Sequence, residues 1–153
     1  MPDDIPALAG TYLLVFESEV DITLTVGRCG RLCLQPGFYL YIGSAFGPGG
    51  LRARVKHHHA ISPRPHWHLD YIRPQLKPLQ VWYSTTDKRL EHAWADAMVY
   101  TMRMQIPLSG LGSSDCQCES HFFYIETRPD EQALQKALTG RQQNMALEKI
   151  EFK

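Results

Sequence analysis

The alternation of apolar and polar residues predicts several strands near the start of the chain. Residues 11–16 are almost continuously apolar, which is typical of a strand that is buried on both faces and lies centrally in a sheet. Residues 21–26 and 31–34 alternate between polar and apolar positions around a glycine-bounded turn, so they predict a hairpin with one face in water. A run of aromatic and branched residues predicts a further strand at 38–42.

The spacing of apolar residues changes to that of a helix after the turn Gly47-Pro48-Gly49-Gly50. Leu51 and Val55 lie one helical turn apart, so they form a stripe that can be buried. Arg54 and His58 have the same spacing and form a neighbouring stripe of cations. The pattern therefore predicts an amphipathic helix with a basic side.

The rest of the chain predicts short elements separated by proline- and glycine-rich turns. In chain order we expect the basic helix to end near residue 61, a short strand or an extended segment entering a helix at 66–72, a loop between Pro74 and Pro78, a strand at 79–84, a helix at 89–103, a strand centred on 122–125, a helix at 129–138, and a tail at 141–153 that is a last helix or partly disordered. These elements predict an α/β (α+β) fold in which a small, mixed, mainly antiparallel β-sheet is flanked by helices.

The chain has the length of one domain, because 153 residues can bury roughly two thirds of the surface that the unfolded chain exposes. We expect a single domain over residues 1–153, with a core at about 10–126 and a helical tail at 129–153. No apolar run approaches the ~20 residues that cross a bilayer, and the start of the chain lacks the features of a secretion signal. We therefore expect a cytoplasmic protein with no membrane partner and with reduced cysteines. The sequence leaves the oligomeric state open and is compatible with a monomer.

The chain carries no net charge, yet its charges are unevenly distributed. Sixteen Lys and Arg residues balance sixteen Asp and Glu residues, so the whole molecule does not attract nucleic acid electrostatically. One short stretch nevertheless gathers seven basic residues with no acidic residue among them: Arg52, Arg54, Lys56, His57, His58, His59 and Arg64. The composition of this stretch fits both a phosphate-binding surface and a solvated helix face.

Five phrases of the chain stand out by their residues and their order. They are Gly10-Thr11-Tyr12, Tyr41-Ile42-Gly43, the pair Arg54 and His58, HWHLDY at 66–71, and SDCQCESH at 114–121. Together they resemble the GIY-YIG nuclease superfamily, and within it the small stand-alone Uri-type branch, some of whose members are fused to DNA-repair glycosylases. The resemblance covers about residues 10–124. It implies a GIY-YIG-like fold with an inserted hairpin at 21–34, because a short turn usually separates the two tyrosine motifs in that superfamily.

The resemblance also implies a function, namely a divalent-metal-dependent endonuclease that hydrolyses DNA phosphodiester bonds with structure-selective or weakly specific cleavage. The catalytic residues that it implies are Tyr12, Tyr41, Arg54, His58 and Glu91. One Mg²⁺ or Mn²⁺ ion would be bound by the Glu91 carboxylate. We expect further substrate contacts from Ser44, Arg52, Lys56 and His68, although Arg52 lies nearly opposite Arg54 on the helix.

Phosphodiester hydrolysis requires a nucleophilic water, a group that takes its proton, and cations that hold the charge on the phosphate oxygens. Under the resemblance, one tyrosine orients the water or takes its proton, and a phenol with a pKa of roughly 10 needs help from Arg54 and the metal to do so. The rigid fork of Arg54 suits two phosphate oxygens, and His58 binds phosphate or shares in proton transfer. A single carboxylate suits Mg²⁺ or Mn²⁺, which keep most of their water ligands.

Two rival interpretations of the whole chain stay open. The first is a non-catalytic nucleic-acid-binding module, because the net charge is zero and about 28 residues separate the two tyrosine motifs at Tyr12 and Tyr41. The second is a zinc-stabilised structural domain. Its ligands would be His66, His68, Cys116 and Cys118, but their spacing is not that of structural zinc sites, so zinc is the less favoured ion.

The candidate residues also have ordinary structural roles. The tyrosines fit half-buried strand aromatics, and Glu91 fits a solvated helix residue. In the same interpretation His57 and His59 lie at the surface, and His68 and Asp70 orient one another or brace the basic helix. Only the arrangement of these side chains in space distinguishes the two sets of roles.

Overall fold

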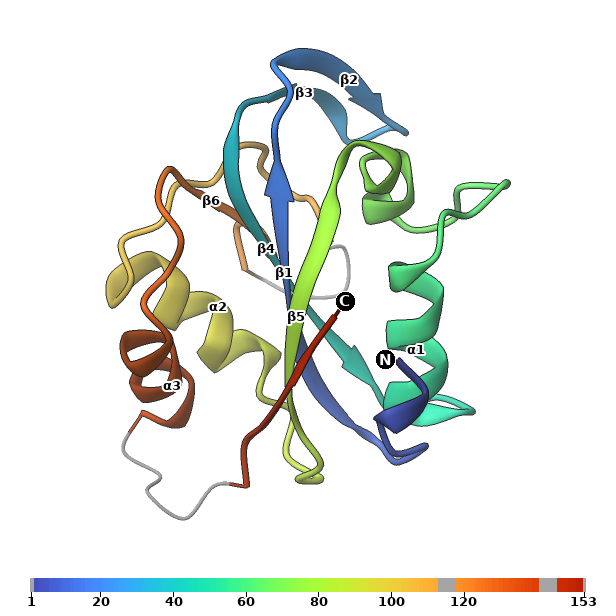
Figure 1. Ribbon diagram of the computed structural model, residues 1–153, viewed down its shortest axis with the longest axis vertical. Coiled ribbons are helices and arrows are strands. Elements are labelled where there is room, and N and C mark those ends of the chain that lie inside the picture. Colours follow the sequence, from blue (N-terminus) through green and yellow to red (C-terminus); the bar gives the residue numbers. More distant parts are fainter. Residues whose placement is uncertain (1, 113–117, 141–145, 153) are drawn as a thin grey trace.

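The structure, a computed structural model, describes residues 2–112, 118–140 and 146–152 and has a small α+β fold (Figure 1). Five strands form one sheet in the order β6-β4-β1-β5-β7, and every neighbouring pair in it is antiparallel. These strands are β1 (Gly10–Ser18), β4 (Gly37–Ala45), β5 (Lys77–Ser84), β6 (Phe122–Ile125) and β7 (Glu148–Glu151). A second sheet contains β2 (Ile22–Val26) and β3 (Gly30–Leu34), and the α-helices are α1 (Gly50–His59), α2 (Glu91–Tyr100) and α3 (Glu131–Thr139).

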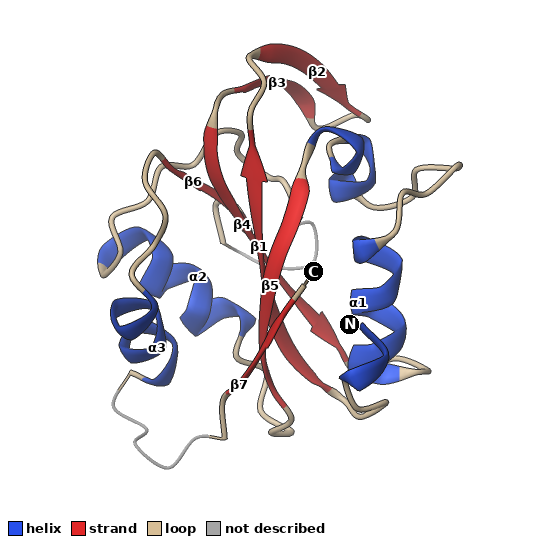
Figure 2. Ribbon diagram, viewed as in Figure 1, coloured by secondary structure: helices blue, strands red, loops and turns tan. Residues whose placement is uncertain are grey.

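The five-stranded sheet separates two layers of helices, with α1 on one face and α2 and α3 on the other (Figure 2). Strand β1 lies in the middle of the sheet, as the apolar run at 11–16 predicts. Its residues alternate between the two cores, so that Leu14 and Phe16 pack in the core beside α1. Leu13 and Val15 pack in the core beside α2 and α3. The continuous apolar run is explained by burial on both faces.

The hairpin predicted at 21–34 forms β2 and β3. Leu32 and Leu34 are buried against the core, whereas Arg31 and Cys33 between them are exposed, which confirms one dry face and one wet face. The hairpin lies at one end of the large sheet rather than within it (Figure 1). It can therefore be inserted between β1 and β4 without disturbing their pairing.

The predicted helices form, and local chemistry sets several of their ends. Helix α1 buries Leu51 and Val55, as their spacing predicts. Helix α3 begins after Asp130, whose carboxylate accepts a hydrogen bond from the Ala133 amide at 2.9 Å, and it ends at Gly140. Helix α2 is shorter than the predicted helix at 89–103.

The end of the chain is a strand rather than the predicted helical tail. Strand β7 pairs with the edge of β5 and places Ile150 opposite Val81. The Lys149 ammonium binds Glu131 on α3 and also lies 3.1 Å from Glu151. The free edge of β5 offers unpaired backbone groups, and the tail satisfies them by adding a strand. Residues 141–145 of the predicted tail lie outside the described residues.

The segment at 66–72 is compact and matches the second of the two predicted forms, an extended segment entering a helix, rather than a short strand. It contains a 3₁₀ helix, η2 (His68–Tyr71). The Asp70 carboxylate accepts hydrogen bonds from the amides of His66 and Trp67 at 2.8 and 2.9 Å, which folds the segment back on itself. The alternation of residues at 66–72 therefore does not reflect a pleated strand.

A second 3₁₀ helix and a strand replace the loop predicted between Pro74 and Pro78. The 3₁₀ helix η3 (Arg73–Gln75) contains the first proline, and β5 contains the second. The buried Arg73 side chain donates to the carbonyl of His58 at 2.9 Å. This bond ties η3 to the end of α1, so the segment after α1 is held against the helix.

Candidate active site

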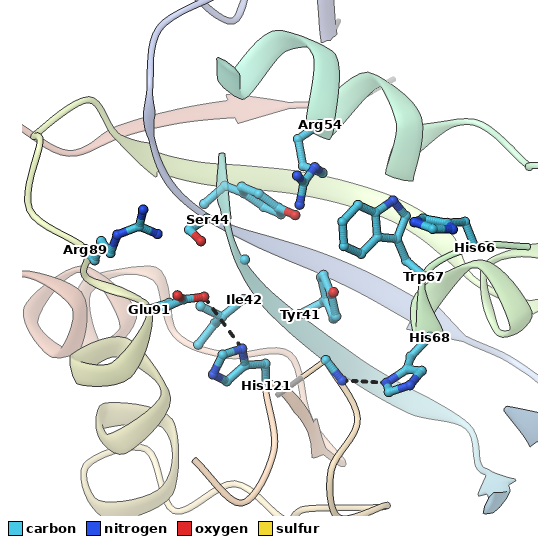
Figure 3. Close-up of a pocket in the computed structure, with 13 residues that line it drawn as sticks. Tyr41, Ile42, Ser44, Arg54, His66, Trp67, His68, Arg89, Glu91 and His121 are labelled. Carbon is cyan, nitrogen blue, oxygen red and sulfur yellow. Dashed lines mark hydrogen bonds and ion pairs between the residues drawn. The ribbon is translucent and has the colours of Figure 1, made fainter. Parts of the chain in front are cut away.

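A pocket of about 590 Å³ opens between α1, α2 and the end of β4 (Figure 3). Four of the residues expected to be catalytic line it: Tyr12, Tyr41, Arg54 and Glu91. They come from four different elements, namely β1, β4, α1 and α2. The fold thus brings two phenols, a guanidinium and a carboxylate into one cavity although they are far apart in the sequence.

The glycine of the second tyrosine motif makes room for the tyrosine of the first. Tyr12 on β1 lies opposite Gly43 on β4 in the antiparallel register. A Cβ atom at Gly43 would lie 2.3 Å from the Tyr12 hydroxyl oxygen, a separation that real structures do not contain. The Tyr12 ring therefore requires glycine at position 43, which gives a packing reason for the two motifs to occur together.

Both phenols keep their protons at neutral pH. Burial raises the pKa of Tyr12 well above its ordinary value, the neighbouring Tyr41 adds to this rise, and Arg54 opposes it. Burial likewise raises the pKa of Tyr41, again against the effect of Arg54. Tyr41 is 4% exposed to solvent, whereas Tyr12 is fully buried. Both phenols line the cavity, Tyr41 is the more exposed of the two, and its hydroxyl is a hydrogen-bonding group rather than a preformed base.

An aromatic ring holds Arg54 in place. The guanidinium carbon of Arg54 lies 4.2 Å from the centroid of the Trp67 ring, which is the geometry of a cation–π contact. Trp67 comes from the segment between α1 and η2, and both side chains line the pocket (Figure 3). Because a stacked guanidinium loses freedom of rotation, its hydrogen-bonding edge stays directed at the cavity.

The buried Asp70 carboxylate connects Trp67 to α1. Besides the hydrogen bonds from the amides of His66 and Trp67, it accepts one from Nε2–H of His57, which lies 3.0 and 3.1 Å from its two oxygens. Burial alone would raise the pKa of Asp70, but these hydrogen bonds hold it below its ordinary value. Asp70 thus braces the basic helix, as one interpretation predicted. The partner is His57, which was expected at the surface, and not His68.

The structure places His58, which was expected to contact phosphate or share in proton transfer, beneath the pocket rather than on its lining. Its side chain is 1% exposed and does not line the cavity, and its ring centroid lies 5.3 Å from that of Tyr41 and 6.0 Å from that of Tyr12. Burial lowers the pKa of His58 to about 3, with His57 adding to the shift and Asp70 opposing it. His58 is therefore a neutral ring that packs against both tyrosines. Arg54 and His58 lie one turn apart on α1, but Arg54 faces the pocket and His58 faces the core.

Glu91 is the first residue of α2 and faces His121. Its Oε2 atom lies 3.9 Å from the Nδ1 atom of His121, which directly precedes β6 (Figure 3). Burial lowers the pKa of His121, and the Glu91 carboxylate opposes this shift. Glu91 remains 23% exposed, so its carboxylate is open to the cavity. This side of the pocket offers an anionic oxygen and a neutral nitrogen, both of which can bind a cation.

Arg89 and His121 also line the pocket, and the sequence did not single out either as a site residue. Arg89 precedes Glu91 by two residues, and its guanidinium lies 4.5 Å from the centroid of the Phe46 ring. Its position two residues before the predicted metal ligand was the sequence signal that could have identified Arg89. His121 ends the phrase at 114–121, whose role could not be derived from the sequence.

The expected substrate-binding residues divide into two groups. Ser44 and His68 line the pocket, and His68 accepts a hydrogen bond from the Gly112 amide at 2.9 Å. Arg52 instead donates to the carbonyl of Ile5 at 2.8 Å, and Lys56 lies 3.5 Å from Asp3. These two cations do not line the pocket, because they lie on the opposite side of α1 and bind the start of the chain.

The zinc interpretation gains no support from the described residues. Cys116 lies outside them, Cys118 is in contact with His92 at 3.1 Å, and His68 already accepts the Gly112 amide. A different group could hold an ion, because ligand atoms of His57, His58 and Asp70 all lie within 4.8 Å of one another. His57 and Asp70 already satisfy one another by hydrogen bonding, and none of the three lines the pocket. We therefore regard this group as a structural network.

Comparison with protein families identifies one match. The model of a family described as a domain of unknown function, DUF123, matches residues 11–143, which include every residue that lines the pocket. The chain belongs to the DUF123 family. Comparisons of this DUF123 protein with curated proteins and with solved structures find no significant match. Among its described residues, no helix is both long enough and apolar enough to cross a bilayer.

Proposed function

We propose that this DUF123 protein is a divalent-metal-dependent endonuclease that hydrolyses DNA phosphodiester bonds. One observation carries the proposal: Tyr12, Tyr41, Arg54 and Glu91 line a single pocket although each comes from a different element. Hydrolysis of a phosphodiester needs fixed cations, a positioned water and a metal ligand in one place. The pocket contains a candidate for each.

Two arginines provide the charge that a phosphate requires. Arg54 is fixed by Trp67 and Arg89 by Phe46, and the two guanidinium groups reach the pocket from different sides (Figure 3). Because each is stacked on an aromatic ring, little freedom remains to be lost when it binds phosphate oxygens. Arg54 would hold the scissile phosphate and Arg89 a neighbouring oxygen.

The phenols would orient the attacking water. Since Tyr41 keeps its proton and retains slight exposure, its hydroxyl can donate to or accept from a water beside the phosphate. Tyr12, whose ring packs over Gly43, lies close enough to Arg54 for the guanidinium to lower its pKa against the effect of burial. When bound by Glu91, Mg²⁺ or Mn²⁺ supplies Lewis-acid chemistry and lowers the pKa of a coordinated water.

The chemistry of the pocket also supports a DNA partner without strict sequence specificity. Cations and phenols contact phosphate oxygens, which are the same in every sequence, whereas sequence is read at base edges. The zero net charge means that attraction to the DNA backbone comes from the pocket and not from the whole molecule. Cleavage should therefore depend on DNA structure more than on sequence.

A cleavage assay tests the proposal. Supercoiled plasmid and branched oligonucleotides are incubated with the full chain in the presence of Mg²⁺, Mn²⁺ or EDTA. We expect nicking or cleavage that requires a divalent ion and is lost in Glu91→Gln, a variant that keeps the size of the side chain. Absence of cleavage with every ion and every substrate, or cleavage that survives both EDTA and Glu91→Gln, would contradict the proposal.

A second candidate function is nucleic-acid binding without catalysis. It is favoured by the burial of Tyr12 and His58, which leaves neither side chain able to take a proton from a solvent water. Binding to DNA that weakens with salt, combined with no cleavage under any of the conditions above, would support this function. Metal-dependent turnover would exclude it.

A further inference from the structure

The backbone holds His121 rigidly at the edge of the pocket. Its amide donates to the carbonyl of Leu111 and its carbonyl accepts from the amide of Ile42, both at 2.9 Å. The residue is 1% exposed, and its imidazole lines the pocket beside Glu91 (Figure 3). The backbone bonds therefore fix the position of the residue, and the packing that buries the ring keeps it at the pocket.

Neither ring nitrogen of His121 makes a hydrogen bond of normal geometry with the described residues, although the Gly112 backbone lies close enough to raise the pKa of the imidazole slightly against the effect of burial. On the pocket side, Glu91 Oε2 lies 3.9 Å from Nδ1, which is too long for a hydrogen bond. Buried polar groups are normally paired, because an unpaired group loses its contact with water and gains nothing in return. The ring nitrogens thus have room for a partner that the described residues do not supply.

We infer that His121 and Glu91 are both ligands of the divalent cation, so that the metal site contains one imidazole and one carboxylate. The inference rests on the proposed function, which requires only Glu91 as a ligand. Two ligand atoms that each lie about 2.1 Å from one ion are roughly 3.0 to 3.5 Å apart. The observed separation of 3.9 Å exceeds this range by less than 1 Å, and the Glu91 side chain is partly exposed, so binding of an ion by both residues requires Glu91 to move only slightly.

A nitrogen ligand changes which ion the site prefers. Mg²⁺ binds oxygen almost exclusively, whereas imidazole is a good ligand for first-row transition ions. The site should therefore select Mn²⁺ over Mg²⁺ at equal concentration. Among the transition ions Mn²⁺ binds such sites most weakly, so it is a stringent probe of this preference.

Electron paramagnetic resonance with Mn²⁺ alone tests the inference on the full chain without DNA. We expect one bound ion whose pulsed spectrum contains a ¹⁴N coupling from a coordinated imidazole. The variant His121→Asn should lose this coupling and bind Mn²⁺ at least about tenfold more weakly, while its Mg²⁺ affinity, measured by competition, changes less. His92→Asn is the matched control, because His92 follows Glu91 on α2 but does not line the pocket.

The wild-type spectrum makes the test independent of whether the variant folds. No ¹⁴N coupling in that spectrum, or a coupling that survives His121→Asn, would overturn the inference. A coupling that is lost in His57→Gln and kept in His121→Asn would overturn it in favour of the network around Asp70. Failure of the proposed function is seen separately, as DNA that stays intact although Mn²⁺ is bound.

Discussion

The two walls of the pocket differ in how their polar groups are satisfied. In the cationic wall, Arg54 and Trp67 line the pocket and the guanidinium packs on the indole. Behind this wall the Asp70 carboxylate accepts hydrogen bonds from two backbone amides and from the His57 ring. In the acidic wall, formed by Glu91 and His121, the described residues bring these two groups only to 3.9 Å and leave the imidazole without a partner. Where the polar groups of a wall already have hydrogen-bond partners, the wall holds a charge in a fixed position. Where a polar group has no such partner, the wall can bind a ligand.

Two buried histidines make the comparison more specific. His58 lies behind the cationic wall and His121 in the acidic wall, and both have unpaired ring nitrogens. Only His121 lines the pocket. His58 instead contacts the rings of both tyrosines, so it fills space beneath them. The position of each ring, and not its degree of burial, decides which of them a ligand can reach.

The largest effect should come from removing the charge of the cationic wall. Arg54→Ala should lower the cleavage rate by about 10³-fold, because a fixed cation is lost where charge develops on the phosphate. Arg52→Ala is the matched control, since Arg52 lies on the same helix but binds Ile5 outside the pocket. The rates are compared under single-turnover conditions. Equal losses in both variants would mean that the charge of α1 matters and its position does not.

The next largest effect on the cleavage rate should come from adding a methyl group at Gly43, which lies against Tyr12. Gly43→Ala places a Cβ atom against the Tyr12 hydroxyl, so we expect a cleavage rate about 10²-fold lower and a free energy of unfolding lower by about 1 to 3 kcal/mol. Denaturant unfolding and cleavage are both measured. At Gly47 no atom lies within 4 Å of an added Cβ, so Gly47→Ala should leave both nearly unchanged.

Acid should destabilise the protein through His58. Because burial lowers its pKa to about 3 in the folded state, against roughly 6.5 when unfolded, the unfolded chain takes up a proton first as the pH falls. This contribution to stability is complete above about pH 6.5 and should decrease by on the order of 3 kcal/mol by pH 4. Urea unfolding at several pH values measures the slope. His58→Leu should flatten it, whereas His92→Gln, at an exposed position, should not.

The smallest effect should come from the ring that holds Arg54. Trp67→Ala should lower the cleavage rate by about tenfold, because a partly desolvated cation–π contact contributes roughly 1 to 2 kcal/mol. Trp67→Phe keeps an aromatic face and should recover most of the rate. If the phenylalanine variant is as slow as the alanine variant, Trp67 acts in some way other than by positioning the guanidinium.

Most of the strands and helices could be predicted because the sequence patterns that indicate them lie within the elements themselves. The apolar run at 11–16 reflects burial of β1 on both faces, and the alternation at 31–34 reflects the single dry face of the hairpin. Asp130 and Gly140 mark the two ends of α3 through their own backbone chemistry. In each case the residue itself, or its nearest neighbours, carries the information.

Two segments could not be fully predicted because their structure depends on distant partners. Strand β7 exists because the edge of β5 offers unpaired hydrogen-bonding groups, and nothing in residues 148–151 identifies that edge. The 3₁₀ helix η2 exists because the Asp70 carboxylate accepts amides within its own segment and the ring of His57. Periodicity records which side of a segment is buried, but not what buries it.

By itself, the sequence determined the order of the strands and helices along the chain and, through resemblance, the residue types of a candidate site: Tyr12, Tyr41, Arg54 and Glu91. Only the tertiary structure decided that these side chains share one cavity, that His58 lies beneath it, and that Trp67, Arg89 and His121 complete its walls. The physical reason is that the contacts within the site join residues separated by tens of positions. Their distances are set by the packing of α1 and α2 on opposite faces of the sheet, which no local pattern encodes.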